Sequence, residues 1–133
     1  MILVDTSAWV ELLRKTGSPV AEAVKDVLDA DEVVVTEVVV MEVLAGARSD
    51  RHYRELRDRL LAFPMLRLGG LADFETAAQI FRTCRVNGET IRAMTDCLIA
   101  ALTIREGAYL LHNDSDFDAI ARHTDLQVHN AAR

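Results

Sequence analysis

Short apolar runs alternate with longer amphipathic segments along the whole chain. Several runs are rich in valine, leucine and isoleucine, which is typical of short buried strands. The predicted strands cover residues 2–4, 33–35, 65–69, 109–112 and 126–129. Between them, apolar residues recur at the spacing of one helix face. The predicted helices cover residues 6–17, 18–30, 37–47, 50–63, 71–85 and 95–107, with one or two helical turns at 116–123.

Polar residues mark where several of these helices begin. Thr6 or Ser7 is the expected N-cap of the first helix, Ser18 of the second, and Thr95 of the helix at 95–107. The run 33–47 is ambiguous because valine favours strands throughout. We divide it at Thr36, which leaves a strand before that residue and a helix after it.

Alternation of short strands with helices predicts an α/β fold, a three-layer α/β/α sandwich with a mainly parallel central sheet. No repeat, low-complexity tract or flexible linker interrupts the 133 residues, so we expect a single domain over residues 1–133. In parallel sheets of this kind the functional crevice lies beyond the carboxyl ends of the strands. Chemistry is therefore expected directly after the strands.

Acidic residues occur at those places. Asp5 ends the first strand, Asp114 follows the strand at 109–112, and Asp96 opens a helix. Glu42 lies among hydrophobic residues of the helix after Thr36, where a carboxylate is rarely buried without a partner. Each has a structural explanation by itself, such as helix capping or turn formation. Together they indicate one composite acidic site.

Such a site needs a cation. Two carboxylates about 5 Å apart repel by roughly 3 kcal/mol at an effective dielectric of 20. Oxygen ligands without a thiolate or imidazole partner suit Mg²⁺ or Mn²⁺. A metal held this way can activate a water for attack on a phosphodiester.

The segment 114–125 partly matches a calcium-binding EF-hand loop. Asp114, Asp116, Asp118 and Asp125 stand at the first, third, fifth and twelfth positions. The sixth position, which requires glycine for a sharp turn, is Ala119, and no helix is predicted on either side. We therefore reject the calcium loop.

Charge and composition narrow the function classes. The net charge of −6 argues against a general nucleic-acid coat, although five arginines gather between Arg48 and Arg59. Acidic residues are interleaved there, so a solvated helix face is the simpler interpretation, and a phosphate-contacting rim is the alternative. Cys84 and Cys97 are expected to be reduced. No apolar run reaches the roughly 18 residues of a membrane helix, and the N-terminal sequence predicts no signal peptide.

Four motifs in order resemble PIN-domain ribonucleases. The stretch MILVDTSAWVELL resembles the family's opening strand and helix, and Glu42 matches its second motif. The stretches MTDCLIAA and LLHNDSDF resemble the third and fourth motifs. In its length, and with no extra domain, the chain most resembles the VapC toxins of type II toxin–antitoxin pairs.

The resemblance implies a cytoplasmic, Mg²⁺- or Mn²⁺-dependent endoribonuclease, usually a homodimer, that is inhibited by a VapB-type antitoxin. It implies catalytic roles for Asp5, Glu42, Asp96 and Asp114, and metal ligation by Asp5, Asp96, Asp114 and Asp116. Two alternatives are a DNA-directed or structure-specific nuclease on the same fold and a non-catalytic binding module for a basic peptide.

Further residues follow from the same resemblance. Thr6 or Ser7 is expected to support Asp5 through a hydroxyl hydrogen bond. His112 stands where many family members carry Thr or Ser, and we interpret it as an imidazole at the core edge rather than a phosphate contact. Arg92, upstream of the third motif, is a candidate RNA contact together with the arginines of 48–59.

Overall fold

The central sheet consists of four short parallel strands. The computed structural model describes residues 1–131. The strands are β1 (Ile2–Val4), β2 (Val33–Val34), β3 (Tyr109–Leu111) and β4 (Gln127–Val128). Their order across the sheet is β2-β1-β3-β4, and all pairs are parallel. The prediction of a mainly parallel sheet within an α/β fold is confirmed.

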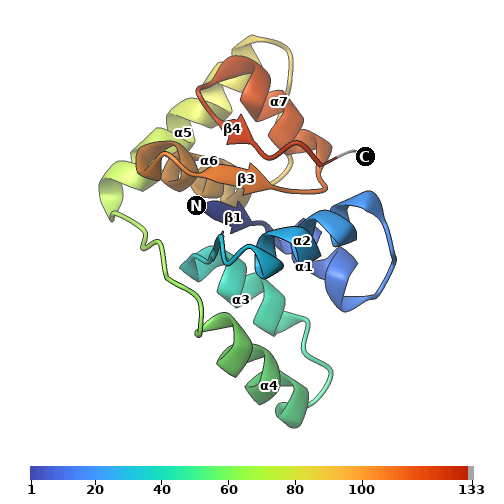
Figure 1. Ribbon diagram of the computed structural model, residues 1–133. Helices are drawn as coiled ribbons and strands as arrows, with labels where there is room; N and C mark the ends of the chain where they lie inside the picture. The colour runs from blue at the N-terminus through green and yellow to red at the C-terminus, as the bar shows by residue number, and fades with distance from the viewer. Residues whose placement is uncertain (132–133) are drawn as a thin grey trace.

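Helices connect every pair of consecutive strands. They are α1 (Thr6–Leu13), α2 (Pro19–Asp29), α3 (Glu37–Ala45), α4 (Asp50–Leu60), α5 (Leu71–Val86), α6 (Met94–Glu106) and α7 (Ser115–His123). The step from β1 to β2 crosses the sheet in one direction, whereas the later steps cross it in the other. Because such crossovers are right-handed, helices cover both faces of the sheet. Helix α3, although it follows β2, packs against α1. Figure 1 shows α5, α6 and α7 gathered apart from α1 to α4.

Most predicted boundaries lie within three residues of the observed ones, and Thr36 does separate β2 from α3. Two N-cap predictions were wrong. Asp5 caps α1, because its side chain accepts the Ser7 backbone N–H at 3.0 Å. Helix α6 begins at Met94 after an extended Ala93, so Thr95 lies inside its first turn.

The predicted strand 65–69 was also wrong for most of its length. Met65 forms an isolated parallel bridge with Val35, and the ladder stops there. Beyond it, the N–H of Leu68 donates to Glu37 Oε1 at 2.9 Å. The N–H of Gly69 donates to Asp73 Oδ2 at 2.6 Å. Side-chain carboxylates therefore take the donors that a strand would have used.

The core forms where the strands meet α6. The run from Cys97 to Thr103 on α6 is buried, and so is the whole of β1. Both cysteines are free and buried. Within residues 1–131, no helix combines the length and apolar character needed to cross a bilayer. The rigid core thus supports the ends of β1 and β3, where the acidic residues stand.

Candidate active site

Pairing of β1 with β3 brings two distant motifs together. The N–H of Asp5 donates to the Leu111 carbonyl at 2.9 Å, so both strands end side by side. Ser7 joins them further: its Oγ donates to Asp5 Oδ2 at 2.6 Å and accepts the Asn113 N–H at 2.9 Å. The hydroxyl support predicted for Asp5 comes from Ser7.

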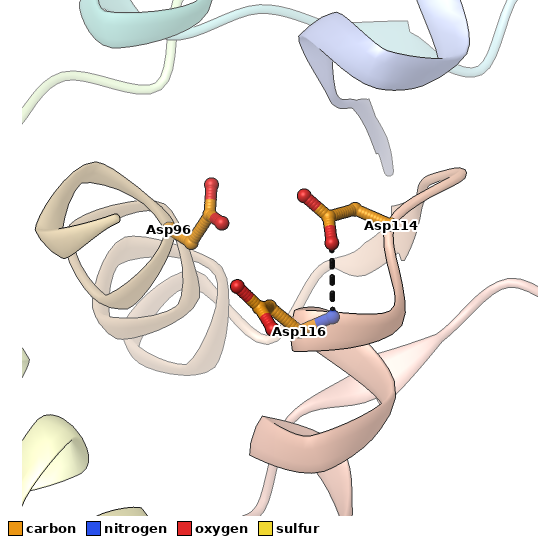
Figure 2. A group of neighbouring side chains, drawn as sticks. All are labelled: Asp96, Asp114 and Asp116. Atoms are coloured by element: carbon orange, nitrogen blue, oxygen red, sulfur yellow. Dashed lines mark hydrogen bonds between the residues drawn. The ribbon is translucent and has the colours of Figure 1, made fainter. Parts of the chain in front are cut away.

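Three other carboxyl groups form the centre of the site. Asp96, Asp114 and Asp116 each offer an oxygen, and these oxygens lie within 4.8 Å of one another. Asp96 comes from the first turn of α6, while Asp114 caps α7 by accepting the Asp116 N–H at 2.9 Å. Figure 2 shows the three side chains converging from these two helices. We call them the acidic triad.

The electrostatics of the triad agree with this crowding. Burial, followed by the charges of Asp5, Asp114, Asp116 and Glu42, raises the pKa of Asp96 to about 7. Burial also raises the pKa of Asp5, with Asp114 as a smaller cause, against the lowering effect of its hydrogen bonds to Ser7. A cation near these groups would relieve the penalty on their charged forms.

Glu42 reaches the site from α3. Thr6 Oγ1 donates to Glu42 Oε1 at 3.0 Å, which ties the glutamate to the first turn of α1. Burial raises the pKa of Glu42, the Thr6 hydrogen bond lowers it, and the Asp5 charge raises it. Glu42 and Asp5 therefore interact electrostatically, although neither belongs to the acidic triad.

Among residues 1–131, Arg92 is the cation that forms ion pairs with the triad. It lies in the loop before α6, and its Nη2 donates to Asp114 Oδ1 at 3.0 Å. Its Nε and its backbone N–H both donate to Asp116 Oδ2 at 3.1 Å. The family resemblance suggested Arg92 as a possible RNA contact, but the sequence gave no sign of these ion pairs.

His112 lies at the core edge, where its contacts are structural. Its side chain is buried, its Nδ1 accepts the Asp114 N–H at 3.1 Å, and its ring lies 5.2 Å from that of Phe117. Its Nε2 lies 3.6 Å from Asp118 Oδ1, so Asp118 faces the imidazole and is not part of the acidic triad. Because α7 already begins at Ser115, no calcium loop forms here.

The arginines of 48–59 contact none of the acidic site residues through an ion pair within residues 1–131. Arg51, on α4, pairs with Glu55 on the same helix at 3.1 Å. Figure 1 shows α4 extending away from α6 and α7. The interpretation of this stretch as a solvated helix face agrees with these contacts.

Comparisons with known proteins agree with this arrangement. The PIN domain matches residues 2–123. This chain belongs to the PIN-domain family. Ribonuclease VapC11 of Mycobacterium tuberculosis is 47% identical over 130 residues, covering 96% of this chain and 97% of the relative. The resemblance drawn from four sequence motifs is thereby confirmed.

Solved structures share the PIN-domain fold. VapBC2 from Rickettsia felis, bound to a DNA fragment from their promoter, matches with a TM-score of 0.75 at 18% identity, covering 98% of both chains. A toxin–antitoxin complex from Klebsiella pneumoniae matches with a TM-score of 0.66 at 20% identity, covering 88% of this chain and 90% of that one. These likenesses confirm the predicted PIN-like three-layer sandwich.

Of the residues predicted as metal ligands, the structure thus brings Asp96, Asp114 and Asp116 together and leaves Asp5 beside them. The sequence predicted Thr6 as an N-cap or as a partner of Asp5, and gave no sign that its hydroxyl binds Glu42. Contacts between residues so far apart in the chain leave no periodic pattern in the sequence.

Proposed function

We propose that this protein is a Mg²⁺- or Mn²⁺-dependent endoribonuclease that acts as the toxin of a toxin–antitoxin pair. The observation that carries the proposal is the acidic triad, whose oxygens approach one another within 4.8 Å at the ends of parallel strands. A relative with 47% identity over nearly the full length is a ribonuclease.

The residues present suit a hard divalent cation. The triad offers only oxygen ligands, and repulsion among its carboxylates favours a bound cation. Asp96, Asp114 and Asp116 would hold it, with Asp5 adjacent. A divalent ion bound there supplies Lewis-acid activation of water for attack on a phosphodiester.

The other acidic residues orient the reactants in this proposal. Thr6 occupies Glu42 Oε1, so Oε2 is the atom available to accept a hydrogen bond from the attacking water. The raised pKa of Glu42 makes it a better proton acceptor than a solvent-exposed glutamate. Ser7 fixes Asp5 through Oδ2, which accepts both the backbone N–H and the hydroxyl of Ser7.

We propose a VapB-type antitoxin as the protein partner, since a structural neighbour is a toxin–antitoxin complex. A groove of about 970 Å³ between α1, α2 and α4 is a suitable docking surface. Its lining combines four leucines with charged residues of both signs.

A homodimer is the expected assembly. Leu71 and Phe74 expose 74% and 52% of their surface on α5. A second copy of the chain could cover such neighbouring apolar side chains. Light scattering of the purified chain would show twice the monomer mass if this expectation holds.

The test of the function is cleavage of total cellular RNA by the purified chain, freed of any co-purifying partner. We expect discrete fragments with Mg²⁺ or Mn²⁺, none with EDTA, and none with Asp96→Asn. Single-stranded DNA is assayed in parallel. Cleavage of DNA alone would indicate the alternative nuclease, and a folded chain without cleavage in either metal would favour a module that binds a basic peptide.

A further inference from the structure

Two members of the acidic triad, Asp114 and Asp116, hold Arg92 at the edge of the triad. Its guanidinium contacts Asp114 Oδ1 through Nη2 and Asp116 Oδ2 through Nε. The side chain nevertheless remains 72% exposed, whereas those of Asp114 and Asp116 are 27% and 14% exposed. The arginine therefore covers part of the two carboxylates and keeps one side open to solvent.

Arg92 and the two aspartates use only some of their polar atoms in these contacts. Within residues 1–131, Asp114 Oδ2 and Asp116 Oδ1 accept no hydrogen bond. Figure 2 shows these two carboxyl groups directed toward Asp96. Arg92 Nη1 likewise makes no hydrogen bond in that part of the chain. One oxygen of each aspartate thus remains for a cation while the arginine keeps free donors.

A structural role alone does not account for Arg92. Ion pairs of a largely exposed arginine contribute only about 0–1 kcal/mol to stability. An RNA phosphate must nevertheless approach this acidic site in a chain of net charge −6. The planar guanidinium fork suits phosphate oxygens, and the arginines of α4 form no ion pair with the acidic site residues in the described chain.

We propose that Arg92 is the phosphate-binding residue of the site, oriented by Asp114 and Asp116 so that its free donors meet the RNA backbone beside the cleaved bond. This proposal rests on the proposed ribonuclease function. It separates two roles within one cluster: the carboxylates hold the cation, and the arginine holds the phosphate.

The experiment compares Arg92→Ala and Arg92→Lys with the parent protein. Binding of a fluorescein-labelled 20-nucleotide single-stranded RNA is titrated at several salt concentrations, in an Asp96→Asn background that prevents cleavage. We expect Arg92→Ala to weaken binding about tenfold at low salt and to reduce the slope of log K against log salt by about 0.7, as for one lost phosphate contact. Arg92→Lys, which keeps the charge, should recover most of the slope.

Mn²⁺ affinity with Asp96 intact, measured by calorimetry, supplies an independent readout. We expect Arg92→Ala to leave it unchanged or to raise it up to about threefold, because a positive charge is removed beside the cation. The matched control is Arg122→Ala, which breaks a comparable pair with Glu89 at the other end of α7 and should leave RNA binding and its salt slope unchanged.

A salt slope equal to that of the parent protein would overturn the proposal. A slope lost equally in Arg122→Ala would also overturn it, because the effect would then belong to overall charge. A fall in Mn²⁺ affinity without a change of slope would show that Arg92 only braces the carboxylates. These are binding measurements, so failure of the proposed function is seen separately, as absence of cleavage by the unmodified chain.

Discussion

Asp96 and Asp73 occupy equivalent local positions and have opposite environments. Both are the acidic residue in the first turn of a long helix, α6 and α5 respectively. Asp73 accepts Arg105 Nε at 2.9 Å and Nη2 at 3.0 Å, and also the Gly69 N–H. Asp96 forms no ion pair within residues 1–131 and faces other carboxylates instead.

The pKa of Asp73 is lowered and that of Asp96 is raised. The hydrogen bonds from Arg105 hold the pKa of Asp73 below its usual range. Burial and neighbouring negative charges raise the pKa of Asp96 to about 7. A buried aspartate that is paired stabilises the fold, whereas one that is crowded by like charges indicates a site for a cation. The comparison can be tested directly.

The largest expected contrast is in activity. We expect Asp96→Asn to reduce the rate of RNA cleavage by about 1,000-fold or more, because it removes a proposed metal ligand. Asp73→Asn should stay within about threefold of the unmodified rate at a temperature where it is folded. Rates are measured on the same RNA at saturating Mn²⁺. Equal losses in the two variants would remove the distinction between them.

In the free energy of unfolding, we expect the larger loss in Asp73→Asn rather than in Asp96→Asn. Asp73→Asn removes the charge from a nearly fully buried carboxylate that binds Arg105, so we expect a loss of about 3 kcal/mol in the free energy of unfolding. Urea unfolding measures it. Glu55→Gln serves as the control, since the Arg51–Glu55 pair is 84% and 58% exposed and should contribute less than about 0.5 kcal/mol. Similar losses in both variants would contradict the structural role of Asp73.

The next effect is a dependence of stability on pH without divalent cations. Folding raises the pKa of Asp96 from 3.8 to about 7, so the native state binds more protons between these values. Stability from this group therefore falls as pH rises from about 4 to about 7, by about 2 kcal/mol after allowance for solvent screening. Unfolding curves of the unmodified chain and Asp96→Asn, compared in EDTA, should diverge in this range. Parallel profiles would show that Asp96 ionises normally.

The smallest effect concerns Ser7, which joins the ends of β1 and β3. Ser7→Ala leaves Asp5 Oδ2 and the Asn113 N–H each without one hydrogen bond. We expect a loss of about 1 kcal/mol in unfolding free energy and a several-fold lower cleavage rate. Thermal unfolding and cleavage assays measure the two quantities. Ser18→Ala, which removes an N-cap remote from the site, should lower stability without lowering the rate of the folded protein.

Local features of the sequence were sufficient for most of the fold. Apolar runs predicted β1 and β3, and Ser18 before Pro19 predicted the start of α2. These features depend on residues a few positions apart, where spacing and capping act directly. Residues 65–69 were misassigned as a strand because the carboxylates of Glu37 and Asp73, which lie outside the segment, accept the N–H groups of Leu68 and Gly69.

The chain by itself determined which acidic residues stand at the ends of the parallel strands, since strand order and helix connections bring those ends to one edge. Only the tertiary structure decided that Asp73 is neutralised by Arg105, that Asp96 is not neutralised, and that Arg92 rests on Asp114 and Asp116. These partners are separated by 32, 22 and 24 positions. At such separations the environment of a charge depends on how helices pack, which no local pattern encodes.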